Sequence, residues 1–200
     1  MPYSHQNVLG YKNVESFYDG REVQGDRSAR AMLIFPQVVE HLTLDPNKTF
    51  ATDAVKFAHM WYTRASQDMK DKFKKLVQNG QIDLCMGGWV ENDESIPYFE
   101  DIIGQFYMGH NWIRHEFDIS PKVGFNLLSQ THTDANAALL HDLGFQALFF
   151  TSKFLQDYQL MNRFNPEIHE SHFLWFPMKE SFDTSRGILG AIVNPWMKQF

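Results

Sequence analysis

The fold class is indicated most directly by residues 123–133, which read Val123-Gly-Phe-Asn-Leu-Leu128-Ser-Gln-Thr-His132-Thr133. This stretch predicts a short apolar strand over 123–128, then a polar turn, then a helix that begins after Thr133. In α/β folds, reactive side chains are mounted at the carboxyl ends of strands. Here that end carries Leu128, whose side chain has no group that could act in catalysis.

Helical and strand-like segments alternate on the N-terminal side of this stretch. Ser66 as a cap and Gly80 as a stop predict a helix that is followed by a strand over 82–86. A longer helix is predicted over 98–117. Parallel strands are connected by crossover helices of this length, so the sequence predicts an α/β fold with a parallel sheet.

The same alternation continues on the C-terminal side. Thr133 is the predicted cap of a helix that buries Ala135, Ala138 and Leu139, and a strand follows over 145–150. Beyond Thr151 the pattern fades, which predicts irregular packing over the sheet. Near the N-terminus, apolar residues at helical spacing predict a helix that Pro36 either kinks or starts.

Composition limits the classes of partner. The 200 residues are 44% apolar, so residues 1–200 are expected to form a single domain. A formal charge of −6 gives no electrostatic basis for binding nucleic acid or an anionic membrane. The one cysteine excludes an internal disulfide, and neither a signal peptide nor a membrane-spanning run is expected from this sequence.

The strongest local motif is Gly87-Gly-Trp-Val-Glu-Asn-Asp-Glu94, which follows a predicted strand. Trp89 offers a flat apolar surface, and Asn92 and Asp93 can donate and accept hydrogen bonds, a combination that suits a sugar. In the alternative interpretation, Asp93 and Glu94 only cap the next helix and Trp89 belongs to the core.

Metal ligands are sparse in the sequence. A carboxylate or amide side chain follows a histidine by two residues in His132-Thr-Asp134 and in His5-Gln-Asn7. One such pair has too few ligands for zinc, and Asp134 also serves the dipole of the helix that begins there.

The motifs together resemble a known family. The sequence looks like the N-terminal α/β domain of the glycoside hydrolase family 38 α-mannosidases. Four segments carry the resemblance: Gly87–Glu94, Gln105-x3-Gly109-His110, Phe117-x3-Pro121-x-Val123-Gly124 and Leu143-Gly-Phe145. The resemblance implies an incomplete, barrel-like parallel sheet with flanking helices. It also implies zinc-dependent, retaining hydrolysis of terminal α-mannosides of N-glycans, and a lysosomal or secretory location.

Residue by residue, the resemblance also shows losses. His5 matches a zinc ligand, but Asn7 stands where the family has an aspartate, and Leu128 stands where the family has the aspartate that is both nucleophile and zinc ligand. A retaining glycosidase needs that carboxylate. We therefore expect no catalytic residue here, weak or absent zinc binding at His5 and Asn7, and no α-mannosidase activity.

Three interpretations remain open at this stage. The chain is a non-catalytic family member that keeps a surface for a mannose-containing glycan around Trp89, Asn92 and Asp93, or a fragment of a true α-mannosidase, or a scaffold module. Because the chain begins just before the histidine motif and stops at Phe200, we expect bare sheet edges, marginal stability and a partner that covers those edges.

Overall fold

The structure is a computed structural model, and it describes residues 3–4, 13–20, 30–92, 98–126, 133–151, 172–180 and 187–192. Two compact units contain these residues. The first unit lies within Met1–Glu91 and Ile103–Ser120, and the second lies within Asn92–Ile102 and Pro121–Phe200.

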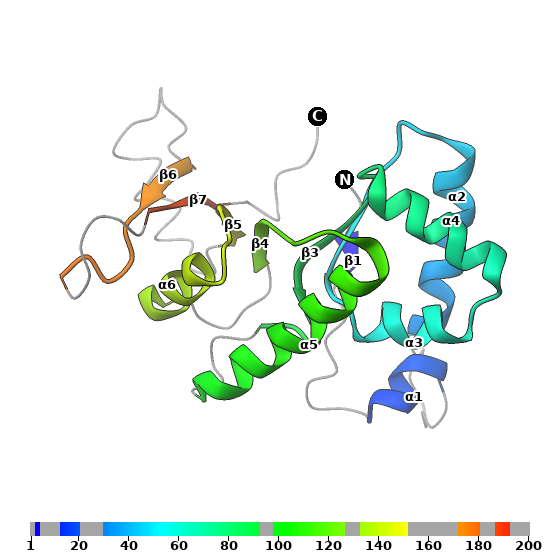
Figure 1. The fold of residues 1–200 in the computed structure, drawn as a ribbon, viewed down its shortest axis with the longest axis horizontal. Helices are drawn as coiled ribbons and strands as arrows, with labels where there is room; N and C mark the ends of the chain where they lie inside the picture. The colour runs from blue at the N-terminus through cyan, green and yellow to red at the C-terminus, as the bar shows by residue number, and fades with distance from the viewer. Residues whose placement is uncertain are drawn as a thin grey trace. The chain divides into compact units, whose positions relative to one another are not determined.

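The first unit is built on three parallel strands in the order β1-β2-β3 (Figure 1). Their bounds are Tyr3–Ser4, Phe50–Ala54 and Ile82–Gly88. The helices of this unit are α1 (Val14–Asp19), α2 (Ile34–Leu44, after a 3-10 turn at Ala31–Leu33), α3 (Lys56–Arg64), α4 (Gln67–Gln78) and most of α5 (Phe99–Phe117).

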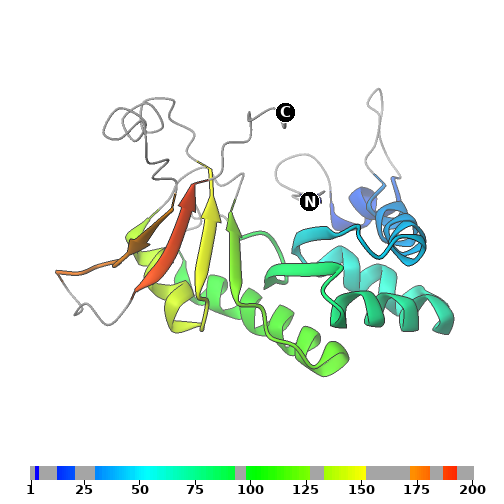
Figure 2. The same ribbon diagram turned by 90° about the horizontal axis from the view of Figure 1, so that it is seen from above.

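The second unit holds a four-stranded sheet in the order β4-β5-β7-β6, whose strands lie side by side in Figure 2. β4 (Val123–Asn126), β5 (Ala147–Phe150) and β7 (Ile188–Ile192) are parallel, and α6 (Asp134–Asp142) connects the first two. β6 (His172–Trp175) pairs antiparallel with β7. The predicted α/β class with parallel strands is confirmed, but the described strands form two sheets and no closed barrel. The irregular packing predicted beyond Thr151 is wrong for β6 and β7.

Local signals explain where several helices begin. Pro36 lies in the first turn of α2, where its missing N–H leaves no helical bond unmade, so it marks the start of the helix rather than a kink. The Ser66 hydroxyl accepts a hydrogen bond from the Met69 N–H at 3.4 Å, and the Thr133 hydroxyl accepts one from the Asn136 N–H at 3.1 Å. Both predicted caps are confirmed.

Of the three residues that the sequence predicts to be buried on α6, Ala135, Ala138 and Leu139, only Ala138 is buried. Asn136, Ala137, Ala138 and Leu140 are buried, whereas Ala135 is exposed and Leu139 is half-buried. From the spacing of apolar residues, alanines are expected in the core and an asparagine is expected on the surface. Asn136 is nevertheless buried because its side chain finds a polar partner, which is described below.

Aromatic rings fill the core of the first unit. Phe35 stacks on Trp61 at 5.9 Å, and the ring of Phe73 meets Trp61 at 5.3 Å and Phe117 at 5.6 Å. These residues come from α2, α3, α4 and α5, so one cluster holds four helices together. Stacked and edge-on aromatic contacts of this kind add about 0.5–1.5 kcal/mol each beyond their buried area.

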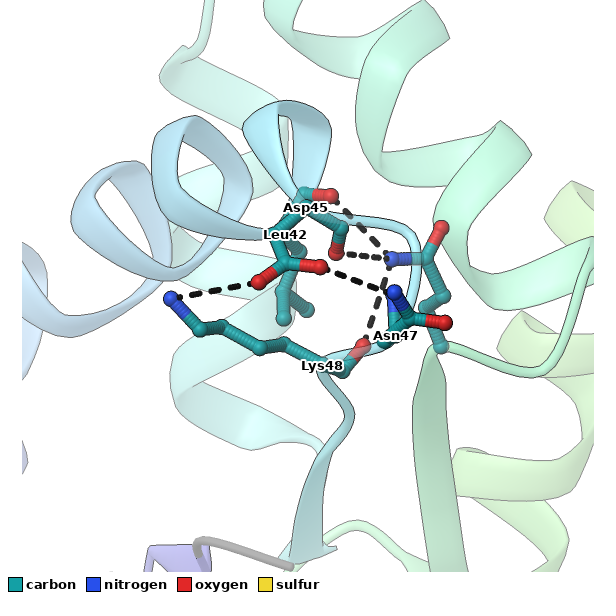
Figure 3. A network of polar contacts seen from close by, with 5 residues as sticks. Leu42, Asp45, Asn47 and Lys48 are labelled. Atoms are coloured by element: carbon teal, nitrogen blue, oxygen red, sulfur yellow. Dashed lines mark hydrogen bonds and ion pairs between the residues drawn. The ribbon is translucent and has the colours of Figure 1, made fainter.

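One buried glutamine fixes the turn between α2 and β2. The side-chain amide of Gln81 donates to the backbone carbonyls of Leu42, Asp45 and Lys48 at 3.1–3.2 Å. The Asp45 carboxylate accepts from the Asn47 N–H at 3.0 Å and lies 3.4 Å from the Lys48 ammonium (Figure 3). Gln81 directly precedes β3, so this network ties the start of β3 to the chain that enters β2.

The end of β3 carries a bulge. Thr52 pairs with Leu84, but Ala54 pairs with Gly88, so β3 has two extra residues between these points. Met86 and Gly87 both have positive φ there, 49° and 65°. For Met86 this backbone conformation costs about 1–2 kcal/mol. The bulge is packed closely against α5, where a Cβ on Gly109 would overlap the Gly87 carbonyl oxygen and lie 2.8 Å from the Trp89 backbone nitrogen.

We predict that Gly109→Ala destabilises the protein by about 1–3 kcal/mol or more, because a backbone, not a flexible side chain, occupies the space. Gly104→Ala on the same helix is the matched control: nothing lies within 4 Å of its Cβ position. That control should gain about 0.5–1 kcal/mol from helix propensity. Urea unfolding followed by circular dichroism measures both, and equal effects of the two substitutions would contradict the packing described.

A second prediction concerns pH and His110. Its Nε2–H donates to the Met86 carbonyl at 2.8 Å. Burial, together with the charge of Arg114, lowers the pKa of His110 below 6.5, although the bond to Met86 acts in the opposite direction. The unfolded chain therefore binds a proton before the folded chain does, and the free energy of unfolding must fall as pH drops below about 6.5.

His110→Gln keeps a donor for Met86 but removes this proton linkage. Between pH 7.5 and 5.5, the wild-type chain should lose more unfolding free energy in urea titrations than the variant does. His59, whose pKa is lowered mainly by burial, contributes with the same sign, so His59→Gln serves as a parallel measurement. A wild-type slope that His110→Gln leaves unchanged would rule out this role of His110.

Candidate functional site: the segment after β3

The backbone after β3 is held from two sides. The Gly88 carbonyl accepts from the Val55 N–H at 2.9 Å, and the Trp89 carbonyl accepts from the Lys56 N–H at 3.0 Å. The Trp89 N–H donates to the Gln105 carbonyl at 3.0 Å, and the Gln105 side chain accepts from Val90. We call residues Gly88–Val90 the β3 junction.

The β3 junction caps α3. No described side chain caps the start of this helix. Instead, the N–H groups of its N-cap residue Val55 and of its first residue Lys56 donate to the carbonyls of Gly88 and Trp89. The two glycines of the motif therefore have a structural role, because they let the backbone turn and approach α3 and α5 closely.

Trp89 is partly buried and packs against the aromatic core. The His59 ring lies 4.9 Å from it at 57°, and the Lys56 ammonium lies 5.2 Å from the indole centroid. His59 also meets Trp112 edge-on at 5.4 Å. Burial, with Lys56 second, lowers the pKa of His59, so this imidazole is neutral at pH 7. Trp89 is thus part of a Trp89–His59–Trp112 column in the first unit, and its indole stays partly exposed.

Asn92 belongs to the second unit and is buried, with 4% of its surface exposed. Its Nδ2 donates to the Asn136 Oδ1 at 3.0 Å. Among the described residues, the Asn92 Oδ1 and the Asn136 Nδ2 have no hydrogen-bond partner. The amide pair ties the chain that follows the β3 junction to the first turn of α6. A sugar would reach Asn92 only after this pair opened.

The remaining predicted site residues lie outside the described residues: Asp93, Leu128, His5, Asn7 and His132. Leu128 comes two residues after the end of β4 at Asn126. Asp134, in the first turn of α6, accepts a hydrogen bond from the Trp175 indole at 2.8 Å. Within the described part of the chain, no three His, Cys, Asp or Glu side chains are grouped closely enough to hold a metal ion.

Two groups near the junction were not singled out from sequence. Asp53 in β2 is buried, with 2% exposure, and the signal for it was a carboxylate within the short stretch Phe50–Ala54, whose other residues are uncharged. His59 lies on α3. The sequence does not indicate this helix, because no capping residue marks its start. Cys85 is buried, and burial raises the pKa of its thiol far above the ordinary value, which makes it inert.

An apolar pocket of about 620 Å³ lies elsewhere in the first unit, between α2 and the start of β2. Its walls include Ile34, Val38, Leu42 and Phe50, with His41 and Lys48 at its polar positions. None of its described lining residues is a carboxylate, whereas chemistry of the glycosidase type uses two. No helix in the described ranges has the length and apolar character needed to cross a bilayer.

Known proteins resemble the chain over most of its length. An α-mannosidase of Arabidopsis thaliana is 34% identical over 158 residues, which cover 78% of this chain and 15% of the plant protein. The lysosomal α-mannosidase of Homo sapiens is 26% identical over 160 residues, covering 78% of this chain and 16% of the human protein. The chain thus spans about 15% of the length of these relatives.

A solved structure agrees in fold. The crystal structure of an α-mannosidase from Enterococcus faecalis V583 matches with a TM-score of 0.62 at 15% identity, over 82% of this chain and 17% of the bacterial chain. The model of the glycosyl hydrolases family 38 N-terminal domain matches residues 1–192. The chain therefore belongs to glycoside hydrolase family 38, and it corresponds to the N-terminal domain of that family.

Proposed function

We propose that this polypeptide is a non-catalytic member of family 38 that binds a mannose-containing glycan weakly. The observation that carries the proposal is Leu128, at the place where the family resemblance puts the nucleophilic aspartate. An aliphatic side chain can neither form the covalent glycosyl intermediate nor stabilise positive charge at the anomeric carbon. Residues 1–192 match one family model, which supports treating the two compact units as parts of a single domain.

The donor set does not fit a catalytic zinc ion. The positions that the resemblance assigns to metal binding hold the His5 imidazole, the neutral Asn7 amide and the Leu128 side chain. Zinc takes about four nitrogen, oxygen or sulfur ligands, and a single imidazole with an amide binds it weakly. No step of the proposed function uses zinc.

The segment after β3 supports a residual glycan contact at Trp89. Its indole is partly exposed and is held in place by His59 and by the junction backbone. A pre-positioned aromatic ring is a suitable stacking surface for the apolar face of a sugar. The proposed surface also includes Asp93 and Asn92. Asn92 becomes part of it once its hydrogen bond to Asn136 has opened.

A second candidate function follows from length. The chain spans about 15% of the length of its relatives. This favours the alternative that the chain is part of a longer α-mannosidase, whose activity resides in the remaining sequence. Reading the coding sequence on both sides for the rest of the family's catalytic region distinguishes the two. The relatives named lysosomal suggest a lysosomal or secretory compartment for such a longer protein. In either case, we propose that a partner covers exposed sheet edges such as β6, where Leu174 is exposed.

The first prediction from this proposal is that the purified chain with Zn²⁺ hydrolyses an aryl α-mannoside no faster than buffer does. Zinc-dependent hydrolysis that His5→Ala abolishes would overturn the proposal. A readout independent of activity is zinc affinity. The double variant Asn7→Asp/Leu128→Asp restores the two carboxylates that the family resemblance assigns to the zinc site together with His5, and in competition with a chelator it should bind zinc at least tenfold more tightly than the wild-type chain.

The second prediction is that α-methyl mannoside binds with a dissociation constant on the order of 1 mM, as for a small ligand held mainly by one stacking contact. Calorimetric titration measures it. Trp89→Ala should remove the binding, and Trp89→Phe should retain part of it. Trp175→Ala, at a half-buried tryptophan on β6, is the matched control. Saccharide binding that survives Trp89→Ala, or a folded wild-type chain with no affinity, counts against the glycan surface and favours the scaffold alternative.

A further inference from the structure

Helix α5 presents an apolar surface that no described part of the chain covers. Tyr107 and Met108 are 69% and 52% exposed in the middle of the helix (α5 in Figure 1). Single exposed apolar residues are ordinary on protein surfaces, but an adjacent aromatic and thioether pair in mid-helix is a typical contact for a partner.

Gly104, one turn before this pair, is also exposed, and nothing lies within 4 Å of its Cβ position. A glycine inside a helix costs about 0.5–1 kcal/mol relative to alanine. Gly109 on the same helix offsets that cost by its close contact with β3, but within the described residues Gly104 has no such contact. An exposed notch beside exposed apolar side chains is the geometry that lets a second helix approach closely.

Charges at the two ends of α5 are of opposite sign. Glu100 and Asp101 are exposed in the first turn, and Arg114 and His115 are exposed near the last. These positions also suit the helix dipole, which accounts for their signs. The dipole does not account for the exposed Tyr107, Met108 and Gly104, which lie between these charged ends on the same face.

The positions fall on one stripe. At 3.6 residues per turn, residues 100, 104, 107, 111 and 114 share one side of a helix, and residues 101, 108 and 115 lie close beside them. The stripe lies on a single continuous helix, so its spacing follows from helix geometry alone. We call it the α5 stripe.

We propose that the α5 stripe is the docking surface for a second copy of this chain, packed antiparallel about a two-fold axis between Tyr107 and Met108. A two-fold arrangement brings each residue opposite the one equally far beyond the axis. The acidic end of each copy then comes opposite the basic end of the other. Within one residue of equal distance from the axis, Glu100 meets Arg114, which lies on the same side of the stripe, and Asp101 meets His115 on the other side. Gly104 lies opposite Asn111, and the pair Tyr107 and Met108 packs against itself.

This self-complementarity identifies the occupant. In the antiparallel arrangement both acidic positions of one copy meet both basic positions of the other, whereas a parallel arrangement brings like charges together. Within one copy, His115 Nδ1 already lies 3.2 Å from the Glu116 carboxylate, so Glu100–Arg114 is the stronger of the two pairs. One helix face per copy is small, and interfaces of that size associate weakly, with a dissociation constant on the order of 0.1 mM.

Sedimentation equilibrium of the full 200-residue chain, up to about 1 mM, tests the proposal. A reversible monomer–dimer equilibrium is expected, and Tyr107→Glu/Met108→Glu should weaken it at least tenfold. Leu44→Glu is the matched control, since Leu44 is an 82% exposed apolar residue at the end of α2. Circular dichroism checks that each variant keeps its fold. A chain that stays monomeric throughout, or a dimer that only Leu44→Glu disrupts, overturns the proposal.

Charge exchange tests the antiparallel pairing itself. Glu100→Lys/Asp101→Lys makes both ends of the stripe basic, and Arg114→Glu/His115→Glu makes both ends acidic. Each double variant alone should lose dimerisation at least tenfold, and an equimolar mixture of the two should regain it as a heterodimer. Failure of the mixture to associate, or association of either variant alone, contradicts the pairing.

Crosslinking provides a measurement that does not depend on affinity. Met108 lies beside the two-fold axis, so Met108→Cys should form a disulfide-linked dimer on oxidation with diamide. The wild-type chain should not crosslink, because its cysteine is buried, and Leu44→Cys should crosslink at least tenfold more slowly. Equal crosslinking of Met108→Cys and Leu44→Cys would show that contact at α5 is not specific.

Discussion

The close contact between the end of β3 and helix α5 is the constraint on which the first unit depends. Gly109 allows the helix backbone to lie directly against Gly87 and Gly88, at a distance that no other side chain would permit. This contact places Gln105 where it holds the Trp89 and Val90 N–H groups. The carbonyls of Gly88 and Trp89 are then free to cap α3, which carries Trp61 and Tyr62 into the aromatic core.

This arrangement gives the Gly-Gly-Trp motif a structural role beside any role in binding. Its glycines form a backbone junction, and its tryptophan is braced by His59 and Lys56. A family member that loses catalysis must still keep such residues to fold. On the proposal that Leu128 stands where the family has its nucleophile, retention of Gly87–Trp89 is physically consistent. These three residues stabilise the fold, whereas the proposed nucleophile position would serve only the reaction.

Much of the fold could be predicted from local signals. The Ser66 and Thr133 caps, the helix start at Pro36 and the long helix α5 follow from hydrogen-bonding groups and apolar spacing close in sequence. Helix α3 was missed because its cap is supplied by Gly88 and Trp89, more than thirty residues further along the chain. Strands β6 and β7 were missed because they depend on pairing with each other and with β5.

The candidate site could also be predicted only in part, because its residues depend on partners that lie far away in the sequence. Trp89 could be recognised as a flat apolar group, but its partners His59 and Lys56 come from α3, which local patterns did not reveal. The burial of Asn92 depends on Asn136, a polar residue on the buried face of α6. Long-range partners of polar groups, rather than residue types, decide which motif residues are accessible.

Native-state hydrogen exchange tests the β3 junction most directly. If the junction holds the unit together, the amide protons of Val55, Lys56 and Trp89 exchange as slowly as those of the β2–β3 ladder, including Phe50, whose N–H donates to the Gln81 carbonyl. All of them should then exchange through the same global unfolding. Rapid exchange at Lys56 and Trp89 while Phe50 remains protected would contradict this, because the strands would then be stable without the junction.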